Sequence, residues 1–143
     1  MRLTFLGVRG STPAAGAPFV RYGGDTSCVG VLLGDEAVPE IVLDAGTGLR
    51  NLTARCGYRP FDGTFLLTHL HWDHVQGLPF FPPADRSDAR VEVFLPAQGD
   101  REGADLLGQL MSPPAFPITP HELGGMWSFH AVDAGPVPIS PQL

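Results

Sequence analysis

The chain has 143 residues, 43% of them hydrophobic and 17% charged, a balance typical of one globular domain rather than a disordered segment. Nine arginines and no lysine face fifteen acidic residues, and the net charge of -6 argues against a broad nucleic-acid-binding surface. The lack of lysine also excludes a P-loop. No secretory signal or membrane span is visible, and Cys28 and Cys56 are too few for a disulfide scaffold, so we expect a cytoplasmic protein with reduced thiols.

The first half of the chain alternates short apolar strands with glycine-rich loops. Its hydrophobic pattern predicts strands over residues 2–6, 28–33 and 41–43. A helix is expected after the third strand, with Thr47 as its N-cap and Gly57 just past its end.

The second half continues this alternation. Apolar runs predict strands over residues 65–68, 91–95 and 127–132. A helix is expected over residues 100–111, capped by the aspartate that begins it, and the proline-laden segment 113–120 is expected to be extended. Strands that alternate with helices indicate an α/β layered domain.

Three histidines and one carboxylate gather directly after the strand predicted at 65–68. In an extended backbone, side chains two positions apart point the same way, so His69, His71 and Asp73 can converge. A turn after Asp73 would bring His74 toward the same centre. Imidazole and carboxylate groups are suitable ligands for zinc, iron or manganese. Four ligands in so short a segment exceed what one open catalytic ion needs, which favours two adjacent ions.

The pattern HxHxDH over residues 69–74 resembles the signature of the metallo-β-lactamase fold. The segments 5–13, 22–28, 43–48 and 75–79 are similar to the phosphodiesterase and ribonuclease Z-like branch of that superfamily. The resemblance implies a four-layer αββα sandwich. The chain would supply its N-terminal half and part of the second half, as one incomplete domain over residues 1–143.

The resemblance also implies a site with two divalent metal ions, expected to be zinc, with manganese or iron as alternatives. His69 and His71 would bind the first ion, and Asp73 and His74 the second. A metal-bound hydroxide would attack phosphorus, and Asp73 would act catalytically by orienting that water. Asp44 would hydrogen-bond near the site and fix a ligand's orientation, or it would only cap the turn before the helix.

The resemblance and the composition together indicate the reaction and its substrate. We expect hydrolysis of a small phosphate ester, such as a cyclic or nucleotide phosphodiester, because the acidic balance disfavours a long RNA. Hydrolysis of a lactam or a thioester stays open, since the motif is shared across those reactions. Two interpretations of the loop that begins at Arg9 stay open: it contacts a phosphate of the substrate, or it is an ordinary glycine-proline turn. A dinucleotide site is disfavoured, because Asn51 stands where the third glycine would be.

The family completes its site with downstream residues that have no clear counterpart here. His121 and His130 are expected to be structural or surface residues, and only residue type favours Asp133 as a bridging ligand. The alternative interpretation is therefore a truncated, non-catalytic metal-binding remnant. In that case exposed apolar faces would favour a homo-oligomer.

Overall fold

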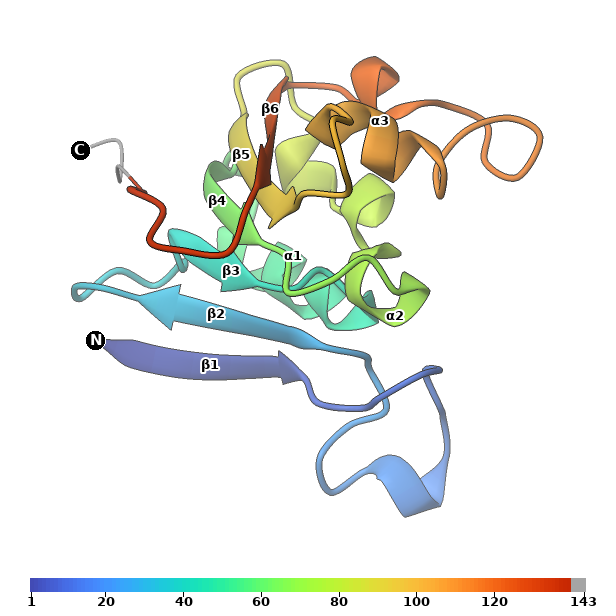
Figure 1. The fold of residues 1–143 in the computed structure, drawn as a ribbon. Helices are drawn as coiled ribbons and strands as arrows, with labels where there is room; N and C mark the ends of the chain where they lie inside the picture. Colours follow the sequence, from blue (N-terminus) through green and yellow to red (C-terminus); the bar gives the residue numbers. More distant parts are fainter. Residues whose placement is uncertain (140–143) are drawn as a thin grey trace.

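The computed structural model describes residues 1–139, in which six strands form one mixed β-sheet (Figure 1). The strands follow the chain order across the sheet: β1 (Arg2–Gly7), β2 (Cys28–Leu32), β3 (Ile41–Leu43), β4 (Asp62–Leu66), β5 (Arg90–Pro96) and β6 (Met126–Val132). The first three strands pair antiparallel, and β3 through β6 pair parallel. The parallel half therefore aligns the carboxyl ends of its strands along one edge.

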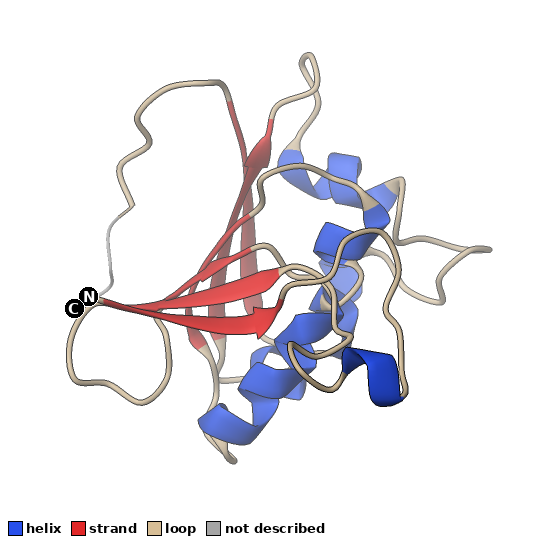
Figure 2. Ribbon diagram, turned by 90° about the horizontal axis from the view of Figure 1, so that it is seen from below, coloured by secondary structure: helices blue, strands red, loops and turns tan. Residues whose placement is uncertain are grey.

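The helices gather on one face of this sheet, as the view from below shows (Figure 2). The α-helices are α1 (Arg50–Cys56), α2 (Trp72–Val75) and α3 (Gly103–Gly108). Short 3-10 helices complete the layer: η1 (Ala17–Phe19), η2 (Thr47–Leu49), η3 (Leu78–Phe80), η4 (Pro82–Ala84) and η5 (Pro120–Glu122). None of the helices within residues 1–139 has the length and apolar character needed to cross a membrane.

Aromatic rings fill the space between the helices and the sheet. Phe65 on β4 is fully buried, and its ring centroid lies 5.4 Å from that of Phe61 and 6.2 Å from that of Phe81. Trp127 on β6 stacks on Phe65 at 6.4 Å. Such ring contacts add to the free energy of apolar burial, so this cluster anchors β4 and the loop that follows it.

Most predicted strands are confirmed, because the alternation of apolar residues reports directly on the buried face. The strands expected at 2–6, 28–33, 41–43, 91–95 and 127–132 agree with the observed ones to within a residue at nearly every end. Gly57 lies just past the end of α1 with a φ of 60°, the left-handed conformation expected of a glycine that ends a helix.

Four local predictions are wrong. The segment 113–120 contains a turn rather than being extended, and the backbone N–H of Phe116 donates to the carbonyl of Ser112 at 2.8 Å. The strand expected at 65–68 is β4, which lies three residues earlier and ends at Leu66. The helix expected at 100–111 is only α3, and Glu102, not the aspartate at 100, precedes it without a side-chain cap. Thr47 does not cap α1, because it begins η2 and its hydroxyl instead accepts the backbone N–H of Thr26 at 2.9 Å. These details depend on contacts between distant segments, which local patterns do not report.

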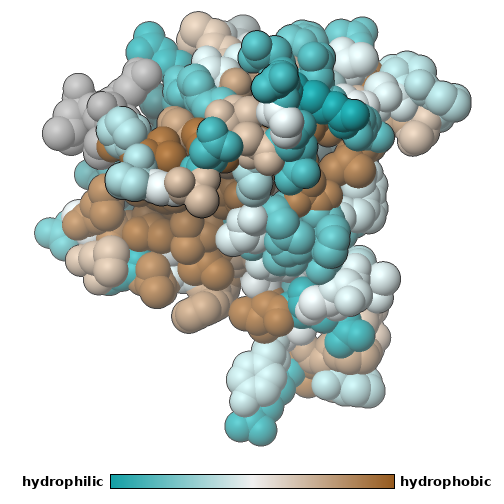
Figure 3. Space-filling model, in the orientation of Figure 1, coloured by the Kyte–Doolittle hydropathy of each residue, from teal (hydrophilic) through white to brown (hydrophobic). Residues whose placement is uncertain are grey.

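The second face of the sheet is apolar and has no helix over it in the described residues. Residues in cross-strand register share a face, and one register row crosses all six strands: Phe5, Val29, Leu43, Leu66, Phe94 and His130. Phe5 is 68% exposed, and apolar side chains gather on this side of the molecule (Figure 3). Residues 1–139 thus form two layers, one sheet and one layer of helices, which confirms the predicted α/β class.

The two cysteines give a direct test of this packing. Cys28 is fully buried on β2, and burial, together with the nearby Asp44 carboxylate, raises the pKa of its thiol to about 12. Burial also raises the pKa of Cys56. Since the thiolate is the reactive form, we expect neither residue of the folded chain to react with a thiol reagent at about pH 8. Both should react after unfolding in guanidinium chloride, and rapid reaction of the folded chain would contradict the packing.

Candidate metal centre

The histidine motif lies at the carboxyl end of β4, beside the carboxyl end of β3. The chain leaves β4 at Leu66 and turns at His71, whose extended backbone (ψ 147°) precedes the first residue of α2. Asp73 and His74 therefore lie inside a helical turn, and the turn comes before Trp72 rather than after Asp73 as predicted. The helical turn nevertheless directs the His74 ring toward Asp44, at the end of β3.

The structure brings the predicted site residues close together. The ring centroid of His69 lies 4.5 Å from that of His71 and 4.0 Å from that of His74. Asp73 Oδ2 lies 3.5 Å from Nε2 of His74. Within residues 1–139, no three His, Cys, Asp or Glu side chains are arranged as a ready-made cation site. The assignment of these four residues as metal ligands therefore stays a prediction, now supported by their proximity.

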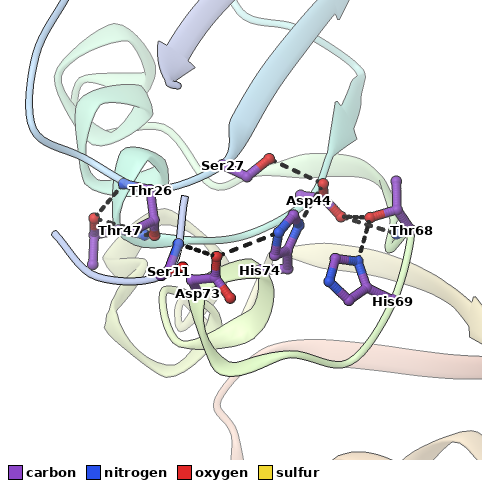
Figure 4. A network of polar contacts seen from close by, with 9 residues as sticks. All are labelled: Ser11, Thr26, Ser27, Asp44, Thr47, Thr68, His69, Asp73 and His74. Atoms are coloured by element: carbon purple, nitrogen blue, oxygen red, sulfur yellow. Dashed lines mark hydrogen bonds and ion pairs between the residues drawn. The ribbon is translucent and has the colours of Figure 1, made fainter. Parts of the chain in front are cut away.

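A buried carboxylate, Asp44, connects this loop to the sheet (Figure 4). Asp44 Oδ2 lies 2.8 Å from Nδ1 of His74 and accepts the hydroxyl of Ser27 at 3.0 Å. Its Oδ1 accepts both the backbone N–H of Thr68 at 2.9 Å and the hydroxyl of Thr68 at 2.8 Å. Asp44 is only 5% exposed. Because its lone pairs are satisfied by four donors, the carboxylate tolerates burial and holds both ends of the loop.

These hydrogen bonds also select the tautomers of two imidazoles. An ionised carboxylate only accepts, so Nδ1 of His74 carries the proton that it donates to Asp44. The single hydroxyl proton of Thr68 likewise goes to Asp44, so the Thr68 oxygen accepts from Nδ1 of His69, which lies 3.0 Å away. In the neutral form of each ring, Nε2 is therefore the unprotonated nitrogen. That is the form in which imidazole binds a metal, so the donor set fits a divalent cation.

Asp44 occupies an unusual backbone conformation. Its φ of 57° lies in the left-handed region, which costs most residues free energy but which aspartate tolerates better than larger side chains. The backbone N–H of Asp44 donates to the carbonyl of Leu66 at 3.0 Å, and that of Ala45 donates to the carbonyl of His74 at 2.7 Å. Of the two roles left open by the sequence, the geometry therefore favours the one in which Asp44 orients a ligand.

Gly46, two residues after Asp44, allows α2 to approach the sheet closely. A Cβ on Gly46 would overlap the carbonyl oxygen of Asp73 and the hydroxyl of Thr26. The backbone N–H of Gly77, just after α2, donates to the carbonyl of Ala45 at 2.8 Å. The histidine loop and α2 therefore pack directly against the segment Asp44-Ala45-Gly46.

A loop from the N-terminal part of the chain completes the surroundings of Asp73. The backbone N–H of Ser11 donates to Asp73 Oδ2 at 2.7 Å. Partial burial raises the pKa of this carboxyl, but the hydrogen bond from Ser11, the backbone of Asp73 itself and the nearby His74 and His69 together outweigh it, so the pKa is lowered. Asp73 is thus ionised at neutral pH, as a metal ligand must be.

The three downstream residues considered as metal ligands do not join the histidine loop. His121 is exposed in η5, Asp133 is exposed after β6, and His130 on β6 places Nε2 2.5 Å from Oε2 of Glu92 on the uncovered face. Sequence reasoning missed Ser27 and Thr68 as partners of Asp44. Small hydroxyl residues are common in loops. Only the pairing of β3 with β2 brings Ser27 to Asp44, and only the pairing of β3 with β4 brings Thr68 to it.

Three curated relatives resemble this chain, all named ribonuclease Z. The chain is 29% identical to the Natronomonas pharaonis protein over 125 residues, covering 82% of this chain and 36% of that protein. It is 35% identical to the Pyrobaculum arsenaticum protein over 80 residues (55% and 25%) and 28% identical to the Bradyrhizobium diazoefficiens protein over 139 residues (96% and 37%). No protein-family model matches the chain. No solved structure gives a significant match.

These relatives confirm the predicted resemblance and correct the predicted substrate. The chain spans between a quarter and about 37% of the length of the relatives it matches. Their name, ribonuclease Z, identifies enzymes that act on RNA, which contradicts the expectation of a small-molecule substrate and of no nucleic-acid surface. The expectation rested on the net charge of -6, which averages the whole surface and does not report the local field at one site.

The role of Asp44 can be tested by replacing it. Asp44→Ala leaves the donors of Ser27, Thr68 and His74 without their acceptor, so we expect the free energy of unfolding to fall by about 3 kcal/mol. We expect zinc affinity to fall by roughly tenfold to a hundredfold. Urea denaturation and competition with a chelating dye measure the two quantities.

Two variants serve as comparisons for Asp44→Ala. Asp44→Asn should lose less stability, because asparagine tolerates the left-handed backbone and still accepts hydrogen bonds. Asp35→Ala, an exposed carboxylate in the turn after β2, should change neither quantity. Equal effects of Asp44→Ala and Asp35→Ala would show that Asp44 does not organise the site.

Proposed function

We propose that this chain, which is related to ribonuclease Z, supplies the metal-binding loop of a metal-dependent hydrolase that cleaves phosphodiester bonds in RNA. One observation carries the proposal: Asp44 and Thr68 hold two neighbouring imidazoles with Nε2 free for a cation. The relatives support the reaction class and the nucleic-acid substrate.

Each of the four motif residues has a proposed role. His69 and His71 hold one divalent ion, and Asp73 and His74 hold the second. Bound ions would supply Lewis acidity, activating a water and balancing charge on the phosphoryl oxygens. Zinc is the preferred ion, because nitrogen donors outnumber oxygen donors, and manganese and iron are the alternatives.

The protein's own groups prepare the site for this reaction. Asp44 prevents His74 from rotating, and Thr68 does the same for His69. The N–H of Ser11 fixes Oδ2 of Asp73, which keeps this carboxylate ionised and aimed at the loop. Asp73 is the proposed group that orients the attacking water. Positioning of this kind lowers the reorganisation that the reaction would otherwise require.

We further propose that the sheet forms half of a four-layer αββα sandwich and that residues 1–139 are part of one metallo-β-lactamase-like domain. The apolar register row from Phe5 to Phe94 supports this, because a second sheet is the natural cover for such a face. The helices already cover the opposite face.

Metal content and RNA cleavage test the proposal together. We expect the chelator-stripped chain to bind zinc, and His69→Ala and His71→Ala to weaken the binding by about tenfold or more. His121→Ala, which removes another exposed histidine, should bind like the unaltered chain. Inductively coupled plasma spectrometry gives the stoichiometry, and cleavage of a short RNA, with the matching DNA as control, gives the activity.

The outcomes separate two functions. Zinc-dependent RNA cleavage that is lost in His71→Ala would establish the hydrolase. Zinc bound through these histidines without cleavage would make the chain a metal-binding module. Equal zinc affinity in all the variants would overturn the metal centre itself.

A further inference from the structure

A small apolar crevice lies beside the histidine loop, between the α2–η3 segment and the α3–η5 segment. We call it the Trp72 crevice, and its walls include Trp72, Val75, Gln76, Leu110, Met111 and Leu123. Its interior volume is about 20 Å³, enough for about one water molecule. Trp72 and Gln76 belong to the same segment as His71 and Asp73, so the crevice is adjacent in the chain to the candidate metal centre, although none of the proposed metal ligands lines it.

Gln76 brings an unsatisfied polar group to this crevice. Its Nε2 is buried, and it is the one buried side-chain nitrogen or oxygen without a hydrogen-bond partner among the described residues. The backbone N–H of Gln76 donates to the carbonyl of Trp72 at 2.9 Å, closing a helical turn that places both side chains on one face of α2. An unpaired buried donor is costly, so the amide is suited to an acceptor that arrives from outside.

Trp72 offers an aromatic surface at the same place. Its side chain is 48% exposed, whereas the other tryptophan, Trp127, stacks between Phe65 and Phe129 in the core. Large exposed aromatic side chains on a binding rim often provide a stacking platform. In the sequence Trp72 lies directly between two proposed metal ligands, His71 and Asp73.

We infer that Trp72 and Gln76 form a subsite for the nucleobase next to the cleaved phosphodiester. The inference rests on the proposed function, which supplies the phosphate at the metal centre. The base stacks on the exposed face of Trp72, and its exocyclic carbonyl oxygen accepts a hydrogen bond from Nε2 of Gln76. The 20 Å³ interior is too small for a ring, so the base lies across the mouth and only an exocyclic group enters.

A nucleobase suits this crevice better than an apolar side chain of a protein partner. A leucine or phenylalanine would match the walls but would leave the Gln76 amide unpaired in a drier environment. A base offers both an aromatic face and an in-plane acceptor, so it satisfies Trp72 and Gln76 together. A protein partner is the alternative outcome of the test below.

Tryptophan fluorescence tests the subsite without any metal or cleavage. The chelator-stripped chain is titrated with a short single-stranded RNA and with an abasic oligomer of equal length, which offers phosphates but no bases. We expect the RNA to quench the emission and the abasic oligomer to quench it much less. Trp72→Leu, which keeps the emission of Trp127, should abolish the quenching and weaken RNA binding by roughly tenfold or more.

Two further variants separate stacking from a change in folding. Gln76→Leu should keep the quenching but reduce RNA affinity several-fold and reduce discrimination among bases. Tyr58→Ala removes a fully exposed aromatic residue far from the crevice and should bind like the unaltered chain. Thermal unfolding of each variant shows whether it keeps the fold, and Trp72→Phe, which retains a stacking ring, should recover part of the affinity.

The outcomes distinguish this inference from the proposed function. Equal affinity of the unaltered chain and Trp72→Leu for RNA would overturn the subsite, and so would equal binding of RNA and abasic oligomer. If RNA is cleaved with zinc, the subsite predicts that Trp72→Leu raises KM and leaves kcat nearly unchanged. Cleavage with an unchanged KM would refute the subsite alone, whereas base-dependent quenching without any cleavage would refute the hydrolase alone.

Discussion

The carboxylate of Asp44 is the group on which the rest of the site depends. It is buried at the end of β3 and accepts hydrogen bonds from Ser27, from Thr68 and from the ring of His74. A buried charge with incomplete partners is strongly destabilising, so the surrounding loop must bring these donors to it. The same hydrogen bonds therefore stabilise the folded loop and orient the imidazoles.

The sheet topology explains why Asp44 and the histidine loop meet. β3 and β4 are parallel neighbours, with Leu43 opposite Leu66, so the segments that follow the two strands leave the sheet at the same edge. Loops at the carboxyl ends of parallel strands lie side by side, which is where α/β proteins commonly place their sites. The close approach then requires a glycine at position 46, since any side chain there would meet the backbone of Asp73.

Much of this arrangement is predictable from the sequence, and the failures have physical causes. The alternation of apolar residues identifies five of the six strands well, and the spacing of the histidines identifies which side chains gather. The partners of Asp44 and the role of Thr47 were not predictable, because each depends on a hydrogen bond to a distant segment. Net charge misled the prediction of the substrate, since it describes the whole surface rather than the site.

The central claim is that Asp44 and Thr68 hold His69 and His74 with Nε2 ready for a cation. Long-range ¹H–¹⁵N NMR of the five histidines, recorded as zinc is added, tests it most directly. The account predicts that His69 and His74 carry the proton on Nδ1 before zinc is added and that their Nε2 resonances move to metal-bound positions, while those of His121 and His130 do not. Mixed tautomers at His69 and His74, or resonances that zinc leaves unchanged, would contradict it.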